Sequence, residues 1–253
     1  MPKLMNKRYE MKGTVRGKVK SRGYIDMKAT ATGAELYLYG DIVDDALTAA
    51  YFGGTCPQEI ADFIGSLNAN APVTIYFNSP GGDVFAGLAI QNILKRHAGR
   101  KTGQVDGMAA SIASAILMGC DEVLVNTGAQ IMVHDPWTYG CGNSRALRET
   151  ADQLDEAKES MLDVYMTKAR EGVTREQIDA LLAAETWMRG EKAAEYFDLG
   201  LKEAPAVAAA ASDLFGSYQN LPEDLKEAEN KKKSDAELKK ALLDDLYLYG
   251  TVE

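Results

Sequence analysis

A serine, a histidine and two adjacent glycines in this chain have the residue types that acyl transfer requires. Ser111 lies in a run of small residues, Gly107-Met-Ala-Ala-Ser-Ile-Ala-Ser-Ala, and His134 ends an apolar run further along. Upstream, Gly81 and Gly82 follow Asn-Ser-Pro. A serine hydroxyl becomes a nucleophile when a neighbouring base accepts its proton, and the backbone N–H groups of a glycine turn can stabilise the resulting oxyanion. The three stretches therefore predict an acyl-transfer site.

Only two histidines are available as the base, His97 and His134. His134 ends a strand-like run and precedes Pro136, which predicts an imidazole at the edge of a sheet. Neutral imidazole titrates in the range needed to accept a serine proton and later return it. The alternative for His134 is a partly buried histidine with a structural role. His97 lies in the polar end of a predicted helix, so we interpret it as a surface residue.

Ser111 begins a predicted helix, where the positive end of the helix dipole favours developing negative charge. The alternative is a small residue chosen for tight packing among alanines, which is our interpretation of Ser114. We expect the backbone N–H groups of Gly82 and Ile112 to be the oxyanion donors, with a plain strand-to-helix turn as the alternative. A triad also needs a carboxylate that orients the histidine, and the residues alone do not choose one.

The acidic composition argues against a dedicated nucleic-acid-binding protein. The chain of 253 residues has a net charge of −9, whereas nucleic-acid-binding domains normally carry a basic surface. Residues 1–30 differ, because they hold nine Lys or Arg against Glu10 and Asp26. We interpret them as a solvated, mobile terminus, with a binding arm as the alternative. No GxxxxGK[ST] pattern occurs, so ATP binding through such a loop is not expected.

Cysteine usage and hydropathy predict a cytoplasmic protein. Cys56, Cys120 and Cys141 are widely spaced and form no CxxC pair, which favours a reducing compartment and no structural metal. Residues 1–20 contain no apolar stretch of the kind found in secretory signals. No apolar run approaches the ~18 residues that span a bilayer. We therefore expect no membrane contact, no metal and no cofactor.

Apolar periodicity predicts strands that alternate with helices. The expected strands are 36–39, 73–77, 101–105, 122–125 and 130–133, and the expected helices are 56–67, 84–94 and 109–118. Such alternation predicts an α/β fold with largely parallel pairing. The 46% of apolar residues is enough for one sizeable core.

A long helix is predicted over 144–171. Leu147, Leu154 and Met161 recur every seven residues, and charged residues fill the other faces. The helix either projects from the body and packs against a partner helix, or it is an ordinary amphipathic helix on the parent core. Thr174 and Gln177 match a capping box, which predicts that a second helix follows directly.

We expect three parts: a basic, flexible lead-in over 1–33, a catalytic domain over 34–203 and a charged tail over 204–253. The tail composition predicts a helix at 235–243 among disordered stretches. The letters LYLYG occur at 36–40 and again at 246–250. Coincidence is the simplest interpretation, and the alternative is a tail that mimics the first strand at a sheet edge.

Taken in order, these motifs resemble the proteolytic subunit of the Clp protease family. The matching stretches are Asn78–Gly82, Gly107–Ile112, Met132–Pro136 and Glu191–Tyr196. The similarity covers about residues 34–202 at the family's spacing. It implies a crotonase-like α/β fold of repeated ββα units, with the long helix as a protruding handle. It also implies serine endopeptidase activity on proteins or peptides, and homo-oligomeric rings, commonly two stacked heptamers.

The resemblance also implies roles for individual residues. Ser111 is the nucleophile and His134 the base, and the family's aspartate aligns with Glu185, with Asp179 and Asp198 as alternatives. An extended substrate would bind along the glycine turn and along the residues after the histidine. The residues implied to contact it are Gly81, Asp83, Val84, Pro136 and Trp137.

Some features depart from the usual family pattern. The Glu-Thr-Trp-Met stretch at 185–188, the basic lead-in and the charged tail look more like the Clp-like head maturation proteases of tailed bacteriophages and prophages. Those proteases trim scaffold and capsid chains inside an assembling capsid, so we expect ATP-independent processing in a host cytoplasm or procapsid. The tail would be scaffold-like, self-cleaved or a tether. The alternatives are a housekeeping subunit served by an ATP-driven unfoldase, a catalytically silent ring, and acyl-CoA chemistry on the same fold.

Overall fold

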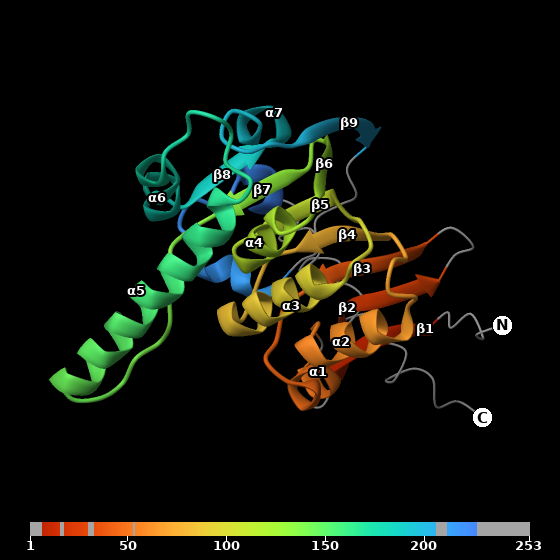
Figure 1. Cartoon of the computed structure of the whole chain (residues 1–253). Helices are drawn as coiled ribbons and strands as arrows, with labels where there is room; N and C mark the ends of the chain where they lie inside the picture. Colours follow the sequence, from red (N-terminus) through yellow and green to blue (C-terminus); the bar gives the residue numbers. More distant parts are fainter. Residues whose placement is uncertain (1–6, 16–17, 30–32, 53, 206–211, 227–253) are drawn as a thin grey trace, which may run out of the picture.

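The computed structural model describes residues 7–15, 18–29, 33–52, 54–205 and 212–226. Over these residues, nine strands form one sheet on which helices pack (Figure 1). The expected α/β class is confirmed. The helix predicted at 235–243 and the second LYLYG stretch lie outside the described residues.

Parallel pairing dominates the centre of the sheet. The parallel strands are, in spatial order, β3 (Ala34–Gly40), β4 (Val73–Ser79), β5 (Lys101–Ala110), β6 (Glu122–Thr127) and β9 (Gly200–Pro205). The first part of β5 pairs with β6, and its last part pairs with β7 (Gln130–Val133). β7 pairs antiparallel with β8 (Thr186–Arg189). The ends of β5 and β7 therefore lie side by side, and Ser111 and His134 directly follow them.

Helices cover one face of this sheet (Figure 1). They include α1 (Ala46–Phe52), α2 (Pro57–Ser66), α3 (Val84–Arg96) and α4 (Ile112–Met118). Their apolar side chains join buried strand residues such as Leu36, Ile75 and Phe77 in the main core. The contact between α3 and α4 is so close that a Cβ added at Gly87 would lie 2.1 Å from Ile112 Cγ1. Small residues are therefore required where these helices meet.

The flexible lead-in expected over 1–33 is wrong for residues 7–15 and 18–29. These form β1 (Lys7–Val15) and β2 (Lys18–Ala29), which pair antiparallel, and β2 extends the sheet along β3. Strands are joined through backbone N–H and C=O groups, which pair whatever the charge of the side chains. The many Lys and Arg residues were therefore a poor basis for predicting a flexible segment, because they do not prevent hairpin formation.

The nucleophile segment also differs from the helix predicted over 109–118. β5 continues to Ala110, and α4 begins only at Ile112, after Ser111. The strand predicted at 101–105 is correspondingly longer. Alanine favours helices in isolation, but pairing of Met108–Ala110 with β7 outweighs that preference here.

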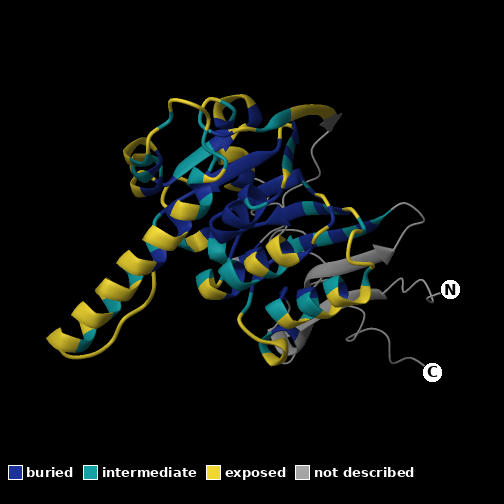
Figure 2. Ribbon diagram, in the orientation of Figure 1, coloured by how far each residue is buried: buried dark blue, intermediate teal, exposed yellow. Residues whose placement is uncertain are grey.

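The long helix has two different halves. α5 (Ser144–Met166) ends earlier than the expected residue 171, and it projects from the body (Figure 1). Its first half is largely exposed, whereas Ala157, Met161, Leu162 and Tyr165 are buried near its end (Figure 2). The second helix is α6 (Arg175–Ala183), and its predicted capping box is present.

His97 is buried, so its interpretation as a surface residue was wrong. Its side chain is 7% exposed, and its Nε2 lies 2.6 Å from Ala71 O. It follows the last turn of α3, where the chain turns back toward β5, and Lys101 Nζ donates to its carbonyl oxygen at 2.9 Å. The charged neighbours Lys95 and Arg96 suggested exposure, but the His97 side chain turns inward and contacts the Ala71 carbonyl.

Part of the expected tail is packed on the body. Residues 213–217 form a short 3-10 helix, η1 (Asp213–Ser217), within the described segment 212–226. Phe215, Leu221 and Leu225 are buried there against strand residues. This segment is neither a free tail nor disordered. The description of 204–253 as one charged appendage overlooked apolar residues spaced through it.

Candidate active site

Ser111 occupies the sharp turn between β5 and α4. Its backbone has φ 54° and ψ −133°, a conformation that costs a non-glycine residue free energy. Its N–H donates to Met132 O at 2.9 Å, which extends the pairing of β5 with β7 by one residue. Its hydroxyl makes no capping hydrogen bond to α4. The hydroxyl is therefore available to a neighbouring side chain.

Two buried hydroxyl groups hold the carbonyl group of Ser111. Ser114 Oγ lies 2.6 Å from Ser111 O, 2.8 Å from Met132 O and 2.8 Å from Tyr165 Oη. Tyr165 also donates to Ser111 O at 3.4 Å. Burial raises the pKa of Tyr165, so its phenol stays neutral and able to donate. Ser114 packs in the core as expected, and it also links the turn to α5.

His134 lies directly beside the serine. Its Nε2 is 2.7 Å from Ser111 Oγ, and both residues are buried. The register that pairs Ala110 with Met132 brings the two strand ends to this separation. Burial lowers the pKa of His134 below its ordinary value. The imidazole is thus neutral near neutral pH, which is the form that can accept the serine proton.

Glu185 lies close enough to His134 for its charge to act on the imidazole. Burial is the largest influence and lowers the pKa of His134, while the charges of Glu185 and Asp135 raise it. The Asp135 carboxylate is itself paired, with Oδ1 3.1 Å from Lys158 Nζ. In the described part of the chain, Ser111 and Glu185, with φ 45°, are the two non-glycine residues with positive φ. Backbone strain is thus found at both ends of this site.

The two alternative acids are placed elsewhere. Asp179 Oδ1 lies 2.5 Å from Lys158 Nζ, and the backbone N–H of Asp198 donates to Lys168 O at 2.8 Å. Among the described carboxylates, neither is a source of the charge that acts on His134. Glu185 is the predicted acid that the structure brings to the histidine.

The glycine turn lies against Ser111. A Cβ added at Gly81, where φ is 99°, would be 2.6 Å from Ser111 Cβ. A Cβ added at Gly82, where φ is 149°, would be 2.0 Å from Ile42 O. The turn is fixed by two hydrogen bonds, from Ile42 N to Gly81 O at 2.8 Å and from Asp83 N to Ile42 O at 2.9 Å. Both positions therefore require glycine.

The two predicted oxyanion donors are free to bind a ligand. Within the described residues, the backbone N–H groups of Gly82 and Ile112 have no hydrogen-bond acceptor. Gly82 lines the cavity beside Ser111, and Ile112 is the first residue of α4. Unpaired donors on both sides of a serine are what an oxyanion hole needs.

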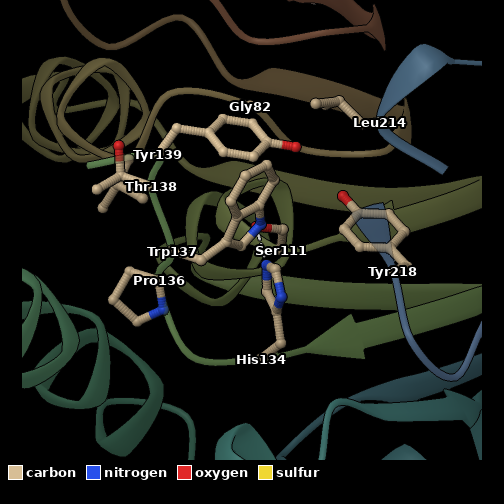
Figure 3. Close-up of a pocket in the computed structure, with 10 residues that line it drawn as sticks. Gly82, Ser111, His134, Pro136, Trp137, Thr138, Tyr139, Leu214 and Tyr218 are labelled. Atoms are coloured by element: carbon tan, nitrogen blue, oxygen red, sulfur yellow. Dashed lines mark hydrogen bonds between the residues drawn. The ribbon is translucent and has the colours of Figure 1, made fainter. Parts of the chain in front are cut away.

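A cavity of about 250 Å³ lies beside the serine and histidine (Figure 3). Four residues from the predicted site line it with them: Gly82, Val84, Pro136 and Trp137. Gly81 instead packs against Ser111 and Ala110. The Asp83 side chain caps α3 by accepting from Ala86 N at 2.7 Å. Gly81 and Asp83 thus shape the turn and do not line the cavity.

Sequence reasoning missed several residues of this cavity. Thr138 and Tyr139 belong to the loop after Pro136, and Leu214 and Tyr218 come from the C-terminal segment (Figure 3). A signal for the last two was present, because apolar residues recur through an otherwise polar stretch. They are Leu214, Phe215, Tyr218, Leu221 and Leu225.

The described ranges show neither a metal cluster nor a membrane-spanning helix. They contain no group of three or more His, Cys, Asp or Glu that could hold a metal ion. All three cysteines are free, and burial raises the pKa of Cys56 and raises that of Cys120 to about 12. None of the helices described is long and apolar enough to cross a membrane.

A serine hydroxyl on a neutral histidine, a nearby carboxylate and two free N–H groups are the parts of a serine hydrolase centre. Comparison with known proteins agrees with this class. The Clp protease family model matches residues 59–201, which is more than half of the chain. The chain therefore belongs to the Clp protease family, and it is a serine peptidase, a hydrolase.

Individual relatives are similar at modest identity. The ATP-dependent Clp protease proteolytic subunit 1 of Chlamydia trachomatis is 30% identical over 138 residues, covering 53% of this chain and 71% of that protein. The corresponding subunit of Bacteroides fragilis is 27% identical over 138 residues, covering 53% of this chain and 65% of that protein. That of Mesostigma viride is 26% identical over 175 residues, covering 68% and 73%.

Proposed function

We propose that this protein is a serine endopeptidase whose catalytic triad is Ser111, His134 and Glu185. The observation that carries the proposal is the 2.7 Å contact between Ser111 Oγ and His134 Nε2 in a buried site. Membership of the Clp protease family supports the peptidase reaction. The positive φ angles of Ser111 and Glu185 support functional roles, since such strain clusters at active sites.

The reaction proceeds through an acyl-enzyme. Ser111 Oγ attacks the peptide carbonyl carbon while His134 Nε2 takes the hydroxyl proton. The N–H groups of Gly82 and Ile112 stabilise the oxyanion. His134 then protonates the leaving amine, and the C–N bond breaks. Water, activated by His134, hydrolyses the ester and regenerates the serine, while Glu185 orients the imidazole and stabilises its charged form.

Protein or peptide substrates bind in an extended form. Val84, Pro136 and Trp137 contact the substrate along the cavity, and Gly81 and Asp83 hold the turn that carries Gly82. Pairing through the backbone gives affinity with little demand on sequence. No cofactor takes part in this mechanism.

The subunits assemble into homo-oligomeric rings of seven, which stack through the projecting half of α5. The exposed first half of this helix supports a contact between subunits, and it includes Leu147, an apolar residue that is 44% exposed. A ring encloses its active sites, so substrate must enter as an extended chain.

The substrates are capsid or scaffold proteins of a tailed phage, cut without ATP during head maturation in the host cytoplasm or inside the procapsid. Three features support this role. A glutamate stands at the acid position, the hairpin of β1 and β2 precedes the family match, and the segment 212–226 follows it. An infected-cell capsid precursor mixed with the purified protein alone should be shortened.

A second candidate is a proteolytic subunit served by an ATP-driven unfoldase. It is favoured by the names of the relatives, which are ATP-dependent Clp protease proteolytic subunits. In this case, folded proteins are degraded only when the unfoldase and ATP are present. Cleavage of a capsid precursor by the protein alone contradicts this candidate.

The test of the peptidase proposal is the intact mass of the full chain after incubation with a fluorophosphonate. A single adduct is expected on the parent chain and on a Ser160→Ala control, whose serine is exposed on α5, and none on Ser111→Ala. Absence of an adduct on the parent, with the fold intact, would favour a silent ring. Coenzyme A that copurifies with the protein would favour acyl-CoA chemistry.

A further inference from the structure

The C-terminal segment 212–226 packs against the strands that carry the catalytic residues. Phe215, Leu221 and Leu225 form a small apolar cluster with Met108, Ala110 and Met132. Ala110 directly precedes Ser111, and Met132 is two residues before His134. The segment is therefore docked on the part of β5 and β7 that ends at the active site.

Polar contacts anchor the segment at both of its ends. Ser212 Oγ donates to Asp41 Oδ1 at 2.7 Å. Near the other end, Gln130 Nε2 donates to Asp224 Oδ2 at 3.1 Å, and Arg189 lies 4.0 Å from the same carboxylate. Since Gln130 begins β7 and Arg189 ends β8, these contacts tie the segment to the strand pair beside His134.

Tyr218 of this segment forms one side of the catalytic cavity. Its ring meets His134 edge-on, with centroids 5.4 Å apart and an interplanar angle of 90°. Its hydroxyl donates to Pro80 O in the glycine turn, and burial raises its pKa, so it stays neutral. Leu214 lies beside it on the cavity wall, opposite Pro136 in the view of Figure 3. The segment thus closes a cavity that the family-matched residues leave open on this side.

Asn220 of the same segment holds the predicted acid. Its backbone N–H donates to Glu185 Oε1 at 2.6 Å. Its side-chain Nδ2 donates to Ala184 O at 2.9 Å and to Glu185 O at 3.3 Å. One residue therefore fixes both the carboxylate and the strained backbone of Glu185.

We infer that residues 212–226 are a working part of the peptidase site, in which Tyr218 determines the substrate side chain accepted and Asn220 is a positioning residue for Glu185. This inference rests on the triad proposed above. Tyr218 acts by limiting the volume of the cavity, and Asn220 acts only through Glu185. Proteolytic trimming that preserves activity must consequently leave Asp224 and Leu225, which anchor the segment, in the chain.

The cavity part of the inference is tested with the full chain and short fluorogenic peptides. The peptides differ only in the residue before the scissile bond, which is Ala, Leu, Phe or Trp. Tyr218→Ala should raise kcat/KM for Trp relative to Leu by roughly 10- to 200-fold, as expected when a pocket changes volume. Tyr218→Phe and the exposed neighbour variant Gln219→Ala should keep the parent preference. An unchanged preference in Tyr218→Ala would overturn this part.

The positioning part is tested with Asn220→Pro, which lacks the backbone N–H, and Asn220→Ala, which keeps it. Asn220→Pro should lower kcat at least tenfold with KM little changed. Asn220→Ala loses only the side-chain bonds to Ala184 O and Glu185 O, so it should lower kcat less than Asn220→Pro does. The charged or titratable groups around His134 are Glu185, Asp135 with its partner Lys158, and Tyr218. In Asn220→Pro the Glu185 carboxylate loses the hydrogen bond that holds it near His134. Its charge then raises the pKa of His134 less, so that pKa falls and the acidic limb of the kcat profile moves to lower pH.

The fluorophosphonate adduct separates the possible failures. A parent chain without an adduct at Ser111 and without peptidase activity overturns the triad and this inference together. A labelled parent whose Asn220→Pro variant is folded, by circular dichroism, and has unchanged kcat and pH profile overturns the positioning role alone. If Asn220→Pro does not fold, the double variant Asn220→Ala/Leu221→Ala takes its place, because loss of Leu221 loosens the docked segment. This variant should lower kcat and move the acidic limb of the pH profile to lower pH. An unchanged kcat and pH profile would overturn the positioning role.

Discussion

The nucleophile side and the acid side of the site are held by different kinds of structure. Ser111 and His134 follow β5 and β7, whose backbone pairing places the two residues side by side, with Ser111 Oγ 2.7 Å from His134 Nε2. Glu185 lies in a turn between α6 and β8, and its carboxylate accepts from Asn220, which is distant in sequence. Both sides have strained backbone, and both follow paired strands, since Val133 of β7 pairs with Thr186 of β8, but the acid side also depends on the hydrogen bond from Asn220.

This difference shows how the two sides can vary. A slip in register between paired strands would move every side chain to the other face, so the serine and histidine segments have little freedom. A turn held by a separate segment can accept a side chain of another length, provided that the segment still forms a hydrogen bond to that side chain. The carboxylate of Glu185 is held in this way by the backbone N–H of Asn220.

Replacing the catalytic histidine should give the largest effect and would test the nucleophile side. His134→Ala is expected to lower kcat/KM by roughly 10⁴- to 10⁶-fold, because His134 is the base that lies on Ser111 Oγ among the described residues. His97→Ala is the control: it should keep kcat/KM and lower the free energy of unfolding by about 1 kcal/mol, since the half-buried Ala71 loses the hydrogen-bond partner of its carbonyl oxygen. Peptide hydrolysis and chemical denaturation measure both. Equal loss of activity in the two variants would contradict the assignment.

Glu185→Gln should have the next largest effect and tests the acid side. The amide keeps an oxygen for Asn220 but loses the charge, so kcat should fall by up to about 10⁴-fold. The charge of Glu185 raises the pKa of His134, so its loss lowers that pKa and moves the acidic limb of the kcat profile to lower pH. The exposed Glu191→Gln variant is the control. A limb that stays in place would show that Glu185 does not act on His134.

Gly81→Ala tests whether the glycine turn and the nucleophile move together. The new Cβ would clash with Ser111 Cβ at 2.6 Å in a backbone conformation with φ of 99°. Displacing the serine by about 1 Å should lower kcat about 10²-fold. Gly65→Ala in α2 meets nothing within 4 Å and should leave kcat unchanged and the stability equal or higher. Full activity in Gly81→Ala would mean that the turn yields without moving Ser111.

Tyr165→Phe should have the smallest effect on catalysis and examines support of the nucleophile from α5. The variant removes a buried hydroxyl 2.8 Å from Ser114 Oγ, which should cost about 1–2 kcal/mol of stability. Because Ser114 still bonds to the Ser111 carbonyl, kcat should fall by less than about tenfold. Tyr196→Phe, in a half-buried position, is the control for both measurements. A loss of kcat as large as that in Gly81→Ala would place Tyr165 among the main supports of the turn.

The elements around the site could be predicted to different degrees. Strand and helix patterns at β3, β4, α2, α3 and β7 were read from local periodicity, because each buries one face or both. The end of β5 was misassigned, because pairing with β7 decides the conformation of alanines that favour a helix alone. The hairpin of β1 and β2 was missed for a similar reason, since backbone pairing is not visible in side-chain charge.

By itself, the sequence determined the α/β class, the elements with strong apolar periodicity, and Ser111, His134 and the glycine turn as candidate site residues. These depend on the spacing of residues that are close together in the sequence, which can be recognised without knowing the tertiary structure. Tertiary structure alone decided that Glu185 lies near enough to His134 for its charge to act on the imidazole, that its carboxylate accepts from Asn220 N, and that Tyr218 lines the cavity. Those contacts join segments far apart in the chain. Pairing of β7 with β8 places Glu185 near His134, and burial of Phe215, Leu221 and Leu225 against the sheet docks the segment that carries Tyr218 and Asn220.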